Sequence, residues 1–168
     1  MRSIRSRESL VNIGHEIIKS LGKYTPYHFP FYTKNHRYRV YINSKIALGA
    51  SPSLYSSSGS FQCVGLCRII DSQSPSKVIV DSTKVFESDT IAECESFVSW
   101  VQSRFTRFFV AINISKLNNI LTDDRFRFVP APPSGKFDHI YTDEELYKAF
   151  NLPQKYIDVI EAVIKERK

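Results

Sequence analysis

Residues Asp89 to Pro130 read DTIAECESFVSWVQSRFTRFFVAINISKLNNILTDDRFRFVP, and the rest of the chain is organised around them. The apolar residues of this stretch recur at the spacing of a helix with one buried face: Cys94, Phe97, Val98, Val101, Phe105, Phe108, Phe109 and Ile112. Thr90 followed by Glu93 is a capping-box pattern, in which each side chain accepts a hydrogen bond from a backbone N–H at the helix start. We therefore expect one central core helix that begins near Ile91.

Two arginines lie beside the phenylalanines of this helix. Arg104 and Arg107 are three residues apart, so they leave the helix at neighbouring positions. They are candidates for nucleic-acid contact, and the alternative is that they only lie along the core or pair with acids such as Asp123. After a break, residues 126–129 (FRFV) predict a strand that Pro130 ends.

The composition indicates one folded domain. The chain has 168 residues, of which 42% are apolar and 13% aromatic, enough for a substantial core and too much for a mainly disordered chain. No apolar run is long enough to span a bilayer, and the N-terminus MRSIRSRESL lacks the apolar run of a signal peptide. The three cysteines, with Cys63 and Cys67 four apart and no second pair, favour reduced thiols in a cytoplasmic protein and no metal site.

The net charge of +6 is concentrated near the N-terminus. Residues 1–45 hold nine basic side chains against Glu8 and Glu16, a net charge of +7, which leaves the remainder at −1. The nine are Arg2, Arg5, Arg7, Lys19, Lys23, Lys34, Arg37, Arg39 and Lys45. This asymmetry favours a polyanionic partner on one side of the fold, although a solubilising surface accounts for the charge equally well.

The first half of the chain reads as a helix followed by strands. Residues 8–21 have apolar positions at helical spacing, and Gly22 is a plausible stop. Residues 37–42 alternate, with Tyr38, Val40 and Ile42 expected on a buried face and Arg37, Arg39 and Tyr41 opposite. Basic side chains interleaved with tyrosines suit phosphate contact and base stacking, and a solvated strand face is the alternative. We expect further strands at 61–70 and 77–82, a long loop at 49–60, and residues 84–86 as the connection to the central helix.

The C-terminal third predicts a helical hairpin. Thr142 to Glu145 is a second capping-box pattern, opening a short helix through Phe150. Asn151 suits a left-handed helix end, and Pro153 suits the first turn of a last helix. That helix has its apolar face at Ile157, Ile160, Val163 and Ile164. The predicted fold is α+β, a mainly antiparallel sheet packed on a central helix with a C-terminal helical hairpin, in one domain with a basic part (1–84) and a core part (85–168).

Motifs for catalysis are not recognisable. No glycine-rich nucleotide loop and no Gly-x-Ser-x-Gly elbow occur, and the four histidines are scattered. The acid and acid-x-Lys pattern of metal-dependent nucleases is not met, because Asp81 and Lys84 are one residue too far apart and Glu166-x-Lys168 lies at the C-terminus. We expect no catalytic residues and no metal ligands.

Three segments in order resemble the C-terminal region of Eco57I-like type II restriction-modification adenine-specific DNA methyltransferases. The segments are SFVSWVQSRFTRFF, FRFVPAPP and YTDEELYKAFNLPQKYIDVIEAVIK, within residues 85–168. The matching positions are Ser103, Arg104, Phe105, Arg107 and Phe108, then Phe126, Phe128, Val129 and Pro130, then residues 142–148 with Phe150 and Leu152. Two departures are Tyr141, where the family usually has Trp, and Lys116, which is followed by Leu117.

The resemblance implies a DNA-binding target-recognition region of a bacterial enzyme. The methyl-donor site and the Asn/Asp-Pro-Pro-Tyr/Phe loop of such enzymes lie upstream, and here Pro132-Pro133 is flanked by Ala131 and Ser134. S-adenosylmethionine would therefore belong to a partner methyltransferase domain or subunit, and this chain would bind no cofactor. Its double-stranded DNA contacts are expected at Lys34, Arg37, Arg39, Lys45, Arg104 and Arg107.

Two other functions stay open. A stand-alone restriction endonuclease would need a divalent metal and a carboxylate cluster. An RNA-binding or protein-interaction module would use a basic strand with tyrosines equally well.

Overall fold

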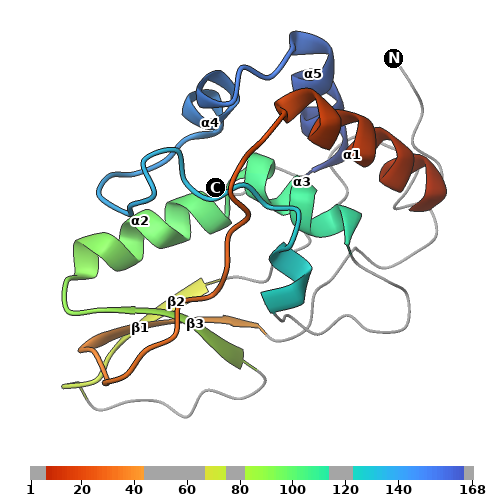
Figure 1. Cartoon of the computed structure of the whole chain (residues 1–168). Helices are drawn as coiled ribbons and strands as arrows, with labels where there is room; N and C mark the ends of the chain where they lie inside the picture. The colour runs from red at the N-terminus through yellow and green to blue at the C-terminus, as the bar shows by residue number, and fades with distance from the viewer. Residues whose placement is uncertain (1–6, 44–66, 75–81, 114–122, 165–168) are drawn as a thin grey trace.

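The computed structural model describes residues 7–43, 67–74, 82–113 and 123–164 and has an α+β fold, as predicted. In chain order the elements are α1 (Arg7–Leu21), β1 (Tyr38–Asn43), β2 (Cys67–Asp71), β3 (Ser82–Ser88), α2 (Ile91–Val101), α3 (Arg104–Ile112), the 3-10 helix η2 (Asp123–Phe126), α4 (Asp143–Ala149) and α5 (Gln154–Val163). Figure 1 shows the sheet at one end of the molecule, α2 along one of its faces, and the other helices beyond α2. The described helices thus lie on one side of the sheet.

The sheet is antiparallel, with strand order β2-β1-β3. β1 alternates as predicted, because Val40 and Ile42 are fully buried while Arg37 just before the strand is exposed. Residues 84–86, expected as a connection, are part of β3 instead, and a bulge opposite Val40 and Tyr41 accommodates Val85. Of the strands expected at 61–70 and 77–82, the described residues show Cys67 to Ile70 and Ser82 as strand, and the loop at 49–60 lies outside the described ranges.

The central helix predicted from Ile91 onward is two helices. Thr90 caps α2 as predicted, since its hydroxyl accepts the backbone N–H of Glu93. The break is at Ser103, whose Oγ donates to the carbonyl of Trp100 (2.7 Å) and accepts from the N–H of Thr106 (3.1 Å). One hydroxyl therefore ends the first helix and caps the second, an example of a serine side chain competing with the helical backbone bonds.

α3 is buried on nearly all sides rather than on one face. It contacts α1, α2, α4, α5 and η2, and every residue from Phe105 to Ile112 is buried. Phe105 and Phe108 are in the core as predicted, each with no exposed surface. The sequence predicted one buried face along this segment. In its second half, which is α3, the prediction is wrong, because neighbouring helices cover both the aromatic and the polar side.

Residues 126–129 do not form the predicted strand. Phe126 ends η2, and the N–H of Val129 bonds back to the carbonyl of Phe126 in a turn. Phe126 and Val129 are both fully buried, which is the spacing of a helical turn and not the two-residue period of a strand. The extended pairing here is one isolated bridge, between Pro130 and Pro26.

The C-terminal hairpin is confirmed. Thr142 caps α4 through the N–H of Glu145, and Asn151 has the left-handed φ of 50° that the sequence predicts. Pro153 is the residue before α5, one position earlier than expected. Ile160, Val163 and Ile164 are buried as predicted, Ile157 is partly buried, and Tyr156 and Val159 join the same face.

α1 packs against α3. It ends at Leu21 before Gly22, which has a φ of +71°, as the sequence predicts. Midway, a Cβ at Gly14 would lie 2.5 Å from the side chain of Ile112, so glycine allows α1 to approach α3 closely. The division expected at residue 84 falls inside β3, so both parts of the chain share one sheet. None of the described helices is long and apolar enough to cross a membrane.

His139, just before α4, lies between the carboxylates of Asp138 and Glu145. This arrangement predicts a pH-dependent contribution to stability. The histidine ring nitrogens lie 2.7 Å from Asp138 Oδ1 and 2.6 Å from Glu145 Oε2, and these hydrogen bonds raise the pKa of His139 above 6.5. A raised folded-state pKa means that the contribution is complete below about pH 6.5 and is lost as the pH rises through the folded-state value. We expect His139→Gln to weaken this dependence by at most about 1 kcal/mol, since the ion pairs are solvent-exposed.

Urea unfolding of both proteins at about pH 5.5 and about pH 8 measures the effect. The wild-type chain should lose more stability than the variant over that interval. Parallel losses in the two proteins would contradict a role for His139.

Candidate nucleic-acid interface

The face of the sheet turned away from α2 collects basic side chains around one tyrosine. Tyr41 in β1 lies opposite Arg68 in β2 and Lys84 in β3, and cross-strand partners share a face. Arg39, two residues before Tyr41, lies on the same face. Arg68 and Lys84 are exposed, and Tyr41 is partly exposed. We call Arg39, Tyr41, Arg68 and Lys84 the outer sheet face.

Arg68 and Lys84 were missed in the sequence because each lay in a segment interpreted differently. Arg68 belongs to a segment expected to be a buried strand, and Lys84 to one expected as a connection. The two-residue alternation of STKV would have placed Lys84 on the polar side, whereas CRIID alternates only over its first three residues, where Arg68 lies between Cys67 and Ile69. Their position beside Tyr41 still depends on the strand order and register, which pattern alone does not give.

Arg37, just before the central strand β1, is held by an ion pair. Its Nε and Nη2 donate to the two carboxylate oxygens of Asp71 at 3.0 Å each, and its guanidinium lies 5.0 Å from the centre of the Tyr38 ring. The hydrogen bonds from Arg37 lower the pKa of Asp71. Arg37 keeps 43% of its side chain exposed, so it can reach a phosphate only by sharing or leaving Asp71.

Arg39 and Lys84 surround a buried carboxylate. Glu87, whose side chain has no exposed surface, lies 3.4 Å from Arg39 Nε and 3.1 Å from Lys84 Nζ, and it accepts the N–H of His36 at 3.3 Å. Two positive charges face one negative charge here, so the cluster keeps a net charge of +1. Arg68 adds one more unpaired positive charge to the outer sheet face, because no carboxylate of the described residues pairs with it.

The other predicted contacts are dispersed. Lys34 is exposed in the loop before β1, near Asp89, whose pKa it helps to lower after the larger effects of hydrogen bonds from Arg37 N–H and His36. Lys45 lies outside the described residues. Lys34 therefore lies close to the sheet end of the fold but is not part of the outer sheet face.

Arg104 and Arg107 face the helical layer. Arg107 is 1% exposed, and its Nε donates to the carbonyl of Gln102 at 2.9 Å. Arg104 lies 3.4 Å from Glu161 of α5. Their charges also help to lower the pKa of Asp143, which desolvation raises overall. As nucleic-acid contacts both stay a prediction, but Arg107 would have to leave the interior to make one.

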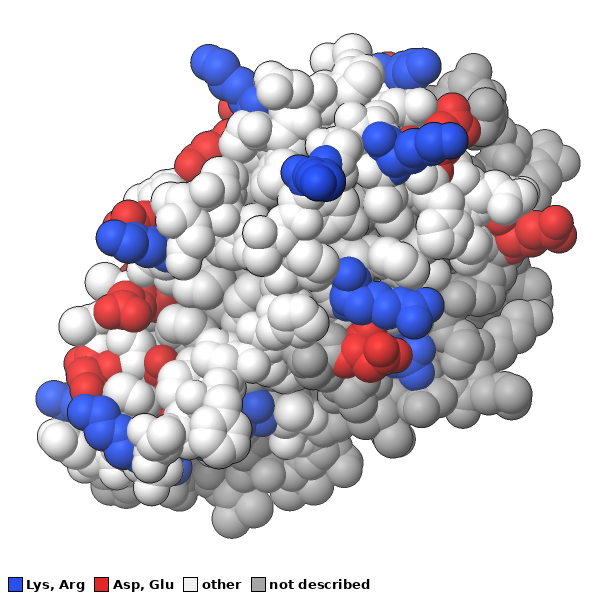
Figure 2. Space-filling view, viewed as in Figure 1, with Lys and Arg blue, Asp and Glu red and all other residues white. Residues whose placement is uncertain are grey.

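Charges of both signs are distributed over the surface. Figure 2 shows lysines and arginines interspersed with acids on the visible face, with no patch of a single sign. The described residues contain no group of three or more His, Cys, Asp or Glu side chains that could hold a metal ion. Comparison of the chain with family models, with curated proteins and with solved structures gives no match.

Proposed function

We propose that this chain is a nucleic-acid-binding module that selects the site at which a bacterial restriction-modification adenine methyltransferase acts. The observation that carries the proposal is the outer sheet face, where three cations surround Tyr41. Cations that contact phosphates release counterions and position the protein, and a few further side chains then read base edges. The resemblance of residues 85–168 to the C-terminal regions of such enzymes supports duplex DNA as the ligand and a separate catalytic partner that binds S-adenosylmethionine.

Single-stranded DNA or RNA is the second candidate ligand. Tyr41 favours it, because a partly exposed ring between cations on a β-sheet face is an arrangement on which an unpaired base can stack. A base within a duplex is already stacked, so duplex binding would use the cations and make little use of the ring. The contribution of Tyr41 therefore distinguishes the two ligands.

Removing two exposed charges from the outer sheet face should weaken binding in a salt-dependent way. We expect the double variant Arg68→Gln, Lys84→Gln to reduce the slope of log affinity against log salt by roughly one unit for each lost phosphate contact. Fluorescence anisotropy with labelled duplex DNA, single-stranded DNA and RNA measures affinity over a salt series. Neutral glutamine avoids placing a new negative charge beside the buried Glu87.

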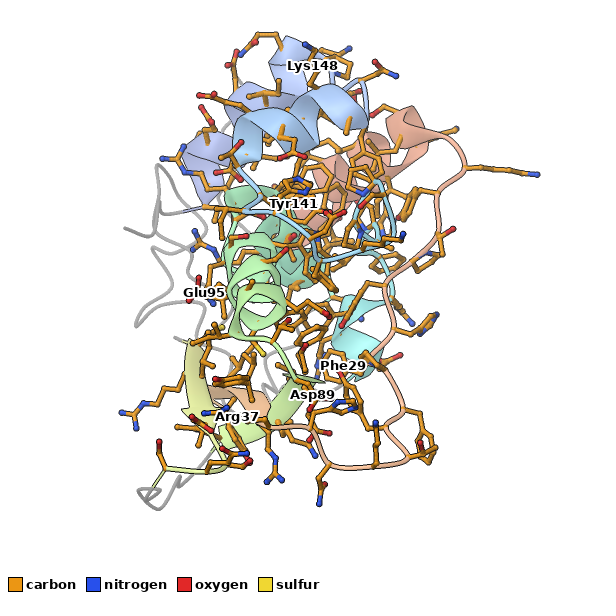
Figure 3. The ribbon with its side chains drawn as sticks, turned by 90° about the vertical axis from the view of Figure 1, so that its left-hand side faces the viewer. Phe29, Arg37, Asp89, Glu95, Tyr141 and Lys148 are labelled. Atoms are coloured by element: carbon orange, nitrogen blue, oxygen red, sulfur yellow. The ribbon has the colours of Figure 1, made fainter. Side chains whose placement is uncertain are left out.

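The matched control is Lys148→Gln, Lys155→Gln, which removes the same charge from exposed positions of α4 and α5. Figure 3 shows Lys148 at the end of the molecule opposite the sheet and Arg37. Equal effects of the two double variants would mean that the outer sheet face has no special role.

Tyr41→Ala, compared with Tyr41→Phe, identifies the ligand. In the alanine variant only, the loss of stacking should weaken the free energy of single-strand binding by about 1–3 kcal/mol. Duplex affinity should stay nearly unchanged. Selection from a pool of randomised duplexes then tests target recognition, which requires enrichment of one sequence over the others.

A further inference from the structure

A groove runs past the start of α2, and none of the cations of the outer sheet face lines it. It consists of two adjoining cavities of about 530 and 410 Å³, and both are lined by Pro30, Phe86 and Glu93. Tyr27 and Phe137 line the first cavity only, and Tyr32 and His36 the second only. We call the two cavities together the α2-end groove. Two cavities that adjoin in this way suit a ligand that spans both.

The floor of the groove is aromatic and well supported. The rings of Phe86 and Phe137 meet edge to face at 5.2 Å between centroids, and Tyr27 meets Phe137 at 6.2 Å. Phe86 is also stacked on Phe97 of the core at 4.7 Å. Aromatic faces fixed in this way attract cations and apolar groups.

The walls of the groove are acidic although the chain carries a net charge of +6. Four acids line it, Glu87, Asp89, Glu93 and Asp138, and Lys136 is the one lysine or arginine among the described lining residues. Glu87 is paired with Arg39 and Lys84. Asp89 is engaged by His36 and by the N–H of Arg37, and Asp138 by His139. Glu93 differs, since its carboxylate has no hydrogen-bond or ion-pair partner within the described residues.

The local cause is a capping box that is only half formed. The hydroxyl of Thr90 accepts the N–H of Glu93, but the N–H of Thr90 bonds to Ser88 Oγ at 3.1 Å instead of to the Glu93 carboxylate. The carboxylate is thereby left at the junction of the two cavities. A negative charge at this point would stabilise a positive charge placed over the aromatic floor.

An exposed aromatic side chain belongs to the chain segment that lines the groove. Phe31 is 92% exposed, and its neighbours Pro30 and Tyr32 both line the groove. Ile91, next to the lining residue Ala92, is also exposed, at 46%. Large apolar side chains exposed beside a concave surface are typical of a protein-interaction site.

From this arrangement we propose that the α2-end groove binds an extended peptide segment of a partner protein, in which a basic residue adjoins an apolar one. The basic side chain lies over the aromatic floor next to Glu93, and the apolar side chain packs against Phe31. The proposal needs no premise about nucleic acid, because none of the four residues of the outer sheet face lines the groove.

The test uses the full chain and three fluorescein-labelled hexapeptides measured by anisotropy. In the first peptide lysine and phenylalanine alternate; in the second glutamate replaces lysine; in the third serine replaces phenylalanine. We expect only the first to bind well. Because the protein is basic, long-range electrostatics disfavours that peptide, and its binding would reflect a local site.

Variants locate the site. Glu93→Gln should lower affinity for the lysine–phenylalanine peptide about three-fold, the size of one exposed ion pair, and Phe31→Ala about ten-fold, as for an aromatic anchor. Glu95→Gln is the matched control, since Glu95 is exposed on the same helix and lies on the opposite side of α2 from Phe29 and Asp89 in Figure 3. It should leave affinity unchanged.

Several outcomes would overturn the proposal. They are no measurable binding of the first peptide, equal binding of the glutamate peptide, or equal effects of Glu93→Gln and Glu95→Gln. Displacement of the peptide by lysine amide alone, at similar concentration, would indicate a site for small cations instead. Self-association that Phe31→Ala abolishes in sedimentation would make a second copy of this chain the occupant.

Discussion

Replacing Phe105 with alanine is expected to lower the free energy of unfolding by about 3–5 kcal/mol, the usual loss for a buried phenylalanine. Phe105 has no exposed surface, is stacked on Phe150 at 5.2 Å between centroids, and meets Phe109 edge to face at 5.0 Å. The substitution removes these contacts and leaves a cavity between α3 and the C-terminal hairpin. Chemical denaturation followed by tryptophan fluorescence measures the loss, since Trp100 is the only tryptophan.

Phe31→Ala is the matched control for this measurement. It removes the same side chain from a position that is 92% exposed, so unfolding should change by less than about 0.5 kcal/mol. Similar unfolding midpoints for the two alanine variants would contradict the burial of α3. Phe108→Ala should resemble Phe105→Ala, because Phe108 is also fully buried.

Arg107→Met is expected to cost about 3 kcal/mol of stability, because it removes one partner of a buried polar arrangement. The substitution keeps much of the side-chain volume but removes the hydrogen bond that Arg107 Nε donates to the Gln102 carbonyl. It also removes a charge that helps to keep Asp143 ionised against desolvation. Denaturant unfolding measures the loss, and nucleic-acid affinity should stay unchanged under conditions where the variant is fully folded.

Arg68→Met is the matched counterpart, with the opposite expected outcome. Arg68 is exposed on the outer sheet face, so its loss should leave unfolding nearly unchanged and reduce the salt dependence of binding. Reduced affinity in the fully folded Arg107→Met variant would mean that the helix arginines contact nucleic acid after all. Unchanged affinity in Arg68→Met would mean that Arg68 does not contact it.

The ion pairs of Arg37 and Arg39 limit which variants can test whether this basic segment binds nucleic acid. Charge reversal of Arg39 would place a second carboxylate beside the fully buried Glu87 and would destabilise the sheet as well as any complex. Reversal of Arg37 would bring its new carboxylate against Asp71. Weaker binding in such variants would therefore mix folding with recognition, and the exposed Arg68 offers a cleaner measurement.

Local patterns were sufficient for much of the architecture. Hydroxyl caps at Thr90 and Thr142, the left-handed Asn151 and the alternation of β1 all follow from interactions within a few residues, and the structure confirms them. The class of fold follows as well, because helical and alternating segments occur in separate blocks. Ser103 is the exception to this local agreement. Its hydroxyl splits the predicted central helix, although the apolar spacing continues across it.

Local sequence patterns were enough to predict the α+β class, the helix caps, the burial of Phe105 and Phe108, and a basic face on β1. Which cations reach the surface depends instead on tertiary packing. Arg107 is enclosed because helices pack on both sides of α3, Arg37 and Arg39 meet acids from β2 and β3, and Arg68 joins Tyr41 through strand pairing. Local periodicity reports which side of an element a residue lies on, but the partner on that side comes from a segment distant in the chain.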